Sequence, residues 1–281
     1  MFRLITPNEL KTLINKRPCQ IIDIREEDEY NNGHLPTAVN IKDFFYYLSE
    51  SDENGLKAMR DSFQDVLNNA GIINDLPIVF YEEEMDKKYG GSCRGAFIMT
   101  YLGHKEVYVL HGGYASWFNA GFEIENKENK LNPSNYLISV NPKYFADYLE
   151  MKNAIGNKDI YILDNRDKVE WLGKSSSPYG VDFSPRKGRI PGAHWLEWYQ
   201  FMEDINGIPM FKPDHIIREL ANKSGMEISD NIIIYCFKGS RASNTLLALY
   251  NAGFTNVKVY FASWFEWAKN NELPTDSSVL E

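Results

Sequence analysis

One cysteine of this sequence, Cys236, stands in a setting that could make its sulfur a nucleophile. It follows the apolar, β-branched run 232–235, which predicts a buried parallel strand, and it precedes a helical apolar pattern at 245–250. Gly253 stands where a helix C-terminus takes a left-handed residue. The thiol is therefore expected at the carboxyl end of a strand, on a short loop that leads into a helix. That edge is where open α/β sheets bind ligands.

The loop after Cys236 contains features that stabilise a thiolate and bind an anion. Gly239 allows a tight turn whose backbone N–H groups point inward, and Lys238 and Arg241 add positive charge. The helix start adds its N-terminal dipole. A lone cysteine beside an apolar strand is usually inert, but this combination favours a reactive thiol. The predicted nucleophile is Cys236, and the predicted substrate-binding residues of its loop are Phe237, Lys238, Gly239, Ser240 and Arg241.

The spacing between Cys236 and Arg241 narrows the predicted reaction. Cysteine phosphatases carry C-x5-R, a cradle that wraps a tetrahedral phosphate, whereas this chain has C-x4-R. In addition, Tyr235 stands where many phosphatases have histidine. A tighter loop suits a single sulfur atom held as a persulfide. We therefore expect sulfur transfer, with a phosphatase or an arsenate reductase as the weaker alternative.

Length and composition set the frame for this site. The 281 residues, of which 43% are hydrophobic and 25% charged, suffice for one large or two ordinary globular domains. A net charge of −9 argues against nucleic acid or an anionic membrane as the main partner. Apolar runs are too short for a membrane span, and the first residues lack a signal-peptide layout. The three cysteines are too widely spaced for a zinc pattern or a disulfide framework. We expect a cytoplasmic protein that needs no metal and no organic cofactor.

Six features of the first half recur in the same order in the second half. The pairs are Thr6-Pro7 with Asn141-Pro142, 21–25 with 160–166, 33–38 with 188–193, 77–81 with 231–235, 102–109 with 252–259, and 116–118 with 263–265. The first pair predicts helix starts, and the second predicts strands that end in Asp-x-Arg. This order predicts a duplicated α/β domain, each copy a parallel sheet flanked by helices on both faces. We expect domains at 1–124 and 140–281, joined by a polar linker at 125–139.

The two halves differ at the predicted site. Glu82 stands where the first half would carry the cysteine, and Glu83 and Glu84 follow it. Three carboxylates would repel a thiolate or an anionic substrate. Cys93 is expected late in a lengthened loop, away from the strand end. The first half is therefore predicted to be catalytically silent.

These motifs resemble the two-domain rhodanese family of sulfurtransferases across nearly the whole chain. That family typically has a silent first half, an Asp-x-Arg strand end, G-H-I-P-G-A in each half and the loop C-x-x-G-x-[RT]. Its C-terminal segment is similar to 260–267, with Ala262 replacing the usual glycine. The Arg241 loop and an insertion at 173–187 are most similar to the bacterial thiosulfate type. The insertion contributes Lys174, Arg186 and Lys187.

The resemblance implies ping-pong transfer of sulfane sulfur from thiosulfate to cyanide or a thiol, through a persulfide on Cys236. Lys238 and Arg241 would bind the oxygens of the donor. Arg166 is expected either to bind substrate or to form a structural pair with Asp164. The alternatives are a 3-mercaptopyruvate sulfurtransferase, which the charged loop opposes, and a persulfide-relay protein with a protein donor.

Two departures from the family pattern predict altered recognition of the donor. Phe237 replaces the arginine that often follows the cysteine. Glu170 stands where vertebrate-type members place a second substrate-binding arginine.

Overall fold

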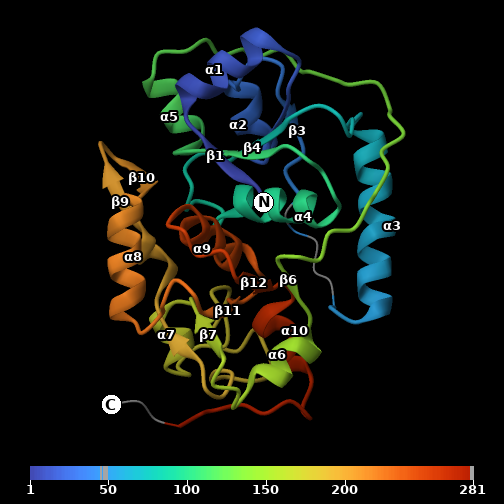
Figure 1. The fold of residues 1–281 in the computed structure, drawn as a ribbon. Coiled ribbons are helices and arrows are strands. Elements are labelled where there is room, and N and C mark those ends of the chain that lie inside the picture. The colour runs from blue at the N-terminus through green and yellow to red at the C-terminus, as the bar shows by residue number, and fades with distance from the viewer. Residues whose placement is uncertain (45, 47–49, 279–281) are drawn as a thin grey trace. The chain divides into compact units, whose positions relative to one another are not determined.

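Each half of the chain folds around its own parallel sheet. The computed structural model describes residues 1–44, 46 and 50–278 (Figure 1). Contacts divide these residues into two compact units. Unit 1 holds most of residues 1–141 together with 204–211, and unit 2 holds most of residues 142–278 together with 50–56. Segment 125–139 lies within unit 1, where its backbone bonds to the rest of that unit at several points, including Ser134 to Asn68 and Ser139 to Leu102.

The described part of unit 1 has a five-stranded sheet in which every pairing is parallel. Its order is β1 (Arg3–Ile5), β5 (Val107–Leu110), β4 (Ile78–Tyr81), β2 (Gln20–Asp23) and β3 (Val39–Asn40). The central strands β2 and β4 are buried at every residue, as expected for a parallel sheet covered by helices. The flanking helices are α1 (Pro7–Lys16), α2 (Glu27–Asn32), α3 (Glu53–Asn69), α4 (Gly91–Tyr101) and α5 (Gly113–Asn119).

The described part of unit 2 repeats this sheet. Its order is β6 (Phe145–Ala146), β12 (Val257–Tyr260), β11 (Asn231–Tyr235), β7 (Ile160–Asp164) and β8 (His194–Trp195), again with every pairing parallel. The helices are α6 (Tyr148–Ala154), α7 (Lys168–Trp171), the 3-10 helix η1 (Trp198–Phe201), α8 (Asp214–Lys223), α9 (Ser240–Asn251) and α10 (Ser263–Lys269). A hairpin of β9 (Met202–Ile205) and β10 (Ile208–Phe211) forms a separate two-stranded sheet, and its residues 204–211 belong to unit 1. The identical strand order confirms the predicted duplication.

The predicted helix start at Asn141-Pro142 is wrong. Residues 145–146 form the edge strand β6, and Asp147 then caps α6 by accepting the Glu150 N–H at 2.8 Å. Thr6 has the same role at α1, where it forms a capping box with Glu9 after the edge strand β1. A two-residue strand is too short to show an alternating pattern, so the apolar residues at 144–149 looked like one helical face.

Candidate active site

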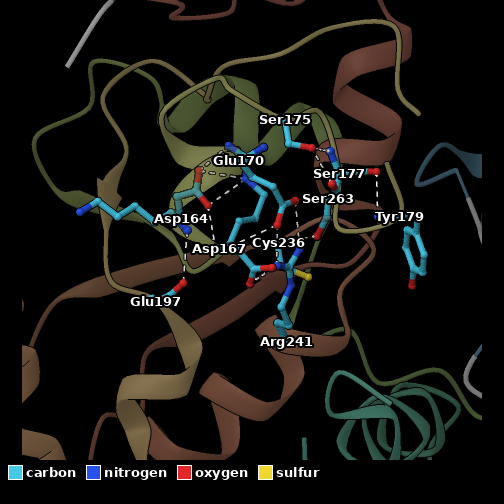
Figure 2. Close-up of polar contacts among 12 residues, drawn as sticks. Asp164, Asp167, Glu170, Ser175, Ser177, Tyr179, Glu197, Cys236, Arg241 and Ser263 are labelled. Carbon is cyan, nitrogen blue, oxygen red and sulfur yellow. Dashed lines mark hydrogen bonds and ion pairs between the residues drawn. The ribbon is translucent and has the colours of Figure 1, made fainter. Parts of the chain in front are cut away.

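The structure places Cys236 directly after β11 and four residues before Ser240, the first residue of α9 (Figure 2). Gly239 caps the helix in the left-handed region, with φ = 87°, which a residue with a Cβ adopts only under strain. In this conformation the Gly239 N–H donates to Sγ of Cys236 at 2.9 Å. The strand, the loop and the helix start therefore direct a backbone donor at the sulfur, and the thiol is buried.

The first turn of α10 holds the cysteine loop in place. The N–H of Cys236 donates to Oγ of Ser263 at 3.2 Å, and this hydroxyl donates to the Tyr260 carbonyl. The Trp264 N–H donates to the Cys236 carbonyl at 3.0 Å, and the Phe265 N–H donates to the Phe237 carbonyl at 2.9 Å. Ser263 is buried and has φ = 56°, so this tethered turn keeps a residue with a side chain in the left-handed region. Sequence reasoning did not identify Ser263.

Arg241 projects from the first turn of α9 into two carboxylates. Its Nη1 donates to Oδ1 of Asp167 at 2.7 Å and to Oε2 of Glu170 at 2.6 Å, while Nη2 donates to Oε1 of Glu170 at 3.1 Å (Figure 2). Arg241 and Glu170 are both buried. Burial disfavours the charged guanidinium, but the negative charge of Glu170 raises the pKa of Arg241 well above its usual value. Asp167 and Glu170 are therefore part of the site, although no sequence pattern had paired them with Arg241.

Arg166 lies at the end of β7 in a fully buried pair with Asp164. Its Nη2 donates to Oδ2 of Asp164 at 2.6 Å and to the Gly188 carbonyl at 2.7 Å. The guanidinium also lies over the Trp264 ring, 4.6 Å from its centroid. Among the residues that the structure describes, its Nη1 has no hydrogen-bond partner. Arg166 thus ties the strand end to the Gly-x-Ile-Pro turn and keeps one buried donor unused.

The ammonium group of Lys238 lies among aromatic rings. Its Nζ is 4.2 Å from the ring centroid of Tyr179, and between 5.5 and 5.7 Å from those of Phe183, Phe237 and Phe265. Phe237 is buried in the core of unit 2 and packs against Tyr179 and Phe183. The side chain of Phe237 therefore belongs to the support of the loop, and the rings attract the Lys238 charge through their negative faces.

The insertion 173–187 forms a loop whose Tyr179 and Phe183 rings pack against Phe237, the residue after Cys236. Two buried serines donate hydrogen bonds to backbone carbonyls of the same loop. Oγ of Ser175 donates to the Ser177 carbonyl, and Oγ of Ser177 donates to the Gly180 carbonyl. Arg186 donates to four backbone carbonyls at the end of α10 and just beyond it, those of Trp267, Ala268, Asn270 and Leu273. The loop presents Tyr179, Val181 and Phe183, each about half exposed, on its outer side.

Cys93 lies in a different setting from the predicted one. It was expected in a loop, but α4 already begins at Gly91, so Cys93 occupies the first turn of that helix and is fully buried. Gly90, the cap of α4, has φ = 77°, and the lengthened loop ends there. Within the described residues no group of three His, Cys, Asp or Glu side chains is placed to hold a metal ion. The described helices include none that is long and apolar enough to cross a membrane.

Known proteins resemble the chain over nearly its whole length. Thiosulfate sulfurtransferase of Rattus norvegicus is 26% identical, over 90% of this chain and 82% of that protein. Sulfur carrier protein TtuD of Thermus thermophilus is 26% identical, over 90% of each. Among solved structures, an anaerobic ergothioneine biosynthesis enzyme from Chlorobium limicola, in complex with its natural substrate trimethyl histidine, is 25% identical. It superimposes with a TM-score of 0.83 over 99% of this chain and 71% of that one.

The family model described as Rhodanese-like domain matches the chain twice, at residues 6–120 and 147–270. These matches cover most of both units, and they include β11, the Cys236 loop and α9. The names of the relatives support sulfurtransferase activity of the rhodanese type. The chain belongs to the rhodanese family and contains two rhodanese-like domains.

Proposed function

We propose that this protein is a thiosulfate sulfurtransferase that carries sulfane sulfur as a persulfide on Cys236. The observation that supports this best is the hydrogen bond from the Gly239 N–H to Sγ, at the start of α9. A backbone donor and a helix N-terminus both favour a negatively charged sulfur. The first unit would serve as the catalytically silent partner.

The reaction would proceed in two steps. First, the Cys236 thiolate attacks the outer sulfur of thiosulfate. A bond forms between Sγ and that sulfur, the S–S bond of thiosulfate breaks, and sulfite leaves with the electron pair. Second, cyanide or a thiolate attacks the terminal sulfur of the persulfide. The Sγ–S bond then breaks, and the thiolate of Cys236 is restored.

The loop would stabilise both the persulfide and the leaving group. The backbone N–H groups of residues 237–241 would surround the terminal sulfur. They include the amide of Gly239 and that of Ser240, which is the first amide of α9. Lys238 would meet the oxygens of the donor. Arg241 and Arg166 would add positive charge from buried positions in which each is paired with a carboxylate, and Nη1 of Arg166 would be available to donate to a bound donor molecule.

A persulfide relay with a protein donor is the second candidate function. Tyr179 and Phe183 expose apolar surface next to the Lys238 ammonium, where a protein partner could bind. The relative named sulfur carrier protein TtuD favours the same function. A 3-mercaptopyruvate donor is less well supported, because the charged loop differs from that enzyme type.

The trimethyl histidine bound by the Chlorobium enzyme suggests a further acceptor. Aromatic rings bind trimethylammonium groups well, and four rings surround the ammonium group of Lys238, two residues after Cys236. In this chain, however, those rings already hold the Lys238 ammonium. A cationic acceptor would have to displace that side chain, which argues against this acceptor here.

Intact mass spectrometry after incubation with thiosulfate tests the proposal. We expect the wild type and Cys93→Ser to gain one sulfur atom, which cyanide removes, whereas Cys236→Ser gains none. An adduct with mercaptopyruvate alone would reassign the donor. If neither small donor loads the wild type, but a protein persulfide does, the protein is a relay. An adduct that persists in Cys236→Ser would overturn the assignment of the nucleophile.

A further inference from the structure

The positive charges around Cys236 are largely compensated within the fold. Two buried guanidinium groups, those of Arg166 and Arg241, face three carboxylates: Asp164 pairs with Arg166, and Asp167 and Glu170 pair with Arg241. Two positive charges therefore stand against three negative ones. The Lys238 ammonium, the remaining cation of the loop, lies over aromatic rings. A donor that approaches the sulfur meets much less positive charge than the count of Lys and Arg residues indicates.

Glu170 is the carboxylate that acts on both guanidinium groups. It is fully buried, and it binds Arg241 through both of its oxygens. It also accepts the Asp167 N–H as part of the cap of α7, which fixes its position. Its negative charge also favours the charged form of Arg166. Figure 2 shows Cys236 next to Arg241 and Glu170. Charges interact strongly in a buried setting, so this carboxylate opposes the accumulation of negative charge at the sulfur.

We propose that Glu170, through its pair with Arg241, determines the charge of the sulfur donor and selects singly charged donors over dianionic ones. This inference rests on the proposed function, because it concerns the donor that loads Cys236. A thiosulfonate monoanion would then be a better substrate than the thiosulfate dianion. Thiosulfate would still react with Cys236, but the loop would bind it less strongly than it binds a singly charged donor.

Two donors with the same reacting group separate charge from chemistry. Thiosulfate carries two negative charges and methanethiosulfonate carries one. In both cases the Cys236 thiolate forms a bond to the outer sulfur and the donor's S–S bond breaks. Sulfite leaves from thiosulfate, and methanesulfinate leaves from methanethiosulfonate, each with the electron pair. The persulfide product is the same, but the leaving groups differ in intrinsic reactivity. The change in the ratio of the two loading rates between variants therefore reports the effect of donor charge.

The test compares kcat/KM for the two donors in the wild type and in Glu170→Gln. The glutamine keeps the shape and an oxygen acceptor for Arg241 but removes the charge. We expect the wild type to prefer methanethiosulfonate. Glu170→Gln should shift the ratio toward thiosulfate by about tenfold, the factor that corresponds to a pKa change of one unit. Raising the salt concentration should change this ratio little, because buried charges are weakly screened.

Glu150→Gln is the matched control. Glu150 lies on α6 in the same unit, pairs with Lys258 at 2.6 Å and is partly exposed. Its substitution removes the same formal charge away from the Arg241 pair, and we expect an unchanged donor ratio. Asp167→Asn removes the other carboxylate from Arg241 and should shift the ratio in the same direction by a smaller factor. It also serves as the deciding variant if Glu170→Gln does not fold, which circular dichroism would reveal.

The outcomes distinguish this inference from the proposed function. If both donors load Cys236 and neither Glu170→Gln nor Asp167→Asn changes the ratio, Glu170 only supports the loop and the inference is overturned. An equal shift in Glu150→Gln would also overturn it, since net charge alone would then explain the effect. If no small donor loads Cys236 in the wild type, the proposed thiosulfate activity fails first.

Discussion

The ends of β4 and β11 are equivalent positions in the two sheets, and backbone N–H groups donate to a different side-chain acceptor at each of them. After β11, Sγ of Cys236 accepts one hydrogen bond from Gly239, and α9 begins at once. After β4, the buried carboxylate of Glu82 accepts the N–H groups of Lys88 and Ser92, at 2.9 and 3.0 Å, and the Ser92 hydroxyl at 2.7 Å. Burial raises the pKa of Glu82, although these hydrogen bonds oppose the rise.

This difference teaches that the loop after the strand offers backbone N–H donors in both domains, and that the side chain that accepts them has changed. In unit 1 the chain supplies its own carboxylate, which occupies the donors around it. In unit 2 the Gly239 N–H donates to the sulfur of Cys236, and under the proposed function the loop would offer its donors to the bound sulfur atom. We therefore propose that the first unit is silent because its donors are already used, in addition to the repulsion expected from Glu82, Glu83 and Glu84.

The framework next to each strand end is the same. Asp23 pairs with Arg25 at 2.7 Å, and Asp164 pairs with Arg166 at 2.6 Å. Nη2 of each arginine also donates to a glycine carbonyl at 2.7 Å, that of Gly33 or of Gly188. The tyrosine that ends each central strand, Tyr81 or Tyr235, donates its hydroxyl to the aspartate. Unit 1 has Glu82 instead of a cysteine at this strand end, yet it retains these contacts. Their primary role is therefore to stabilise the fold.

The largest expected effect comes from removing the framework arginine in either unit. Arg25→Met and Arg166→Met each leave a buried aspartate without its cation, so each should lower the free energy of unfolding by about 3 to 5 kcal/mol. Urea denaturation followed by circular dichroism measures the loss. If Arg166→Met remains as stable as the wild type but loses thiosulfate loading, Arg166 is primarily a substrate-binding residue. Its pair with Asp164 would then differ in role from the pair of Arg25 with Asp23.

A smaller effect should follow from acid, and it should arise in unit 1. His111 follows β5, whereas Phe261 follows β12. Burial lowers the pKa of His111 to about 4, and its Nε2 accepts the Phe211 N–H at 3.0 Å. The unfolded ring titrates near pH 6.5. Since the native state favours the neutral ring, this stability is complete above that pH and is lost as the pH falls toward 4.

The loss from His111 should amount to about 3 kcal/mol between pH 7 and pH 4, because its pKa differs by about 2.5 units between the folded and unfolded states. Urea unfolding at several pH values measures it. His111→Gln keeps an acceptor for Phe211 but does not titrate, so its stability should fall less over the same range. An equal loss in that variant would show that other groups govern the acid response.

The smallest effect on stability should come from substitution of the two cap glycines, which should differ in their effect on persulfide loading. Gly239 and Gly90 both have positive φ, so alanine at either position should cost about 1 kcal/mol or slightly more. Gly239→Ala should also displace the N–H that contacts Sγ, and persulfide loading should fall strongly, whereas Gly90→Ala should leave loading unchanged. Loading is measured by intact mass and stability by urea denaturation. Equal loading in the two variants would contradict the proposed role of the Gly239 amide.

Some of the fold could be read from local patterns. Thr6-Pro7 predicted the start of α1, because a capping side chain and a proline act within one helical turn. The apolar runs before Glu82 and Cys236 predicted the central strands β4 and β11. The very short edge strands β1 and β6 were not predicted, because their pairing with β5 and β12 depends on residues far away in the sequence.

The sequence by itself determined the duplication and the position of Cys236 on a glycine-containing loop at a helix start, because strand, turn and cap preferences act over a few residues. Only the tertiary structure decided what the charged residues do. Glu170 and Arg241 are 71 positions apart, and Cys236 and Ser263 are 27 apart. Folding of the sheet brings each pair together, and burial then makes their contacts strong. For that reason the sequence indicated a strongly cationic loop, whereas the structure shows one whose buried charges are balanced by carboxylates.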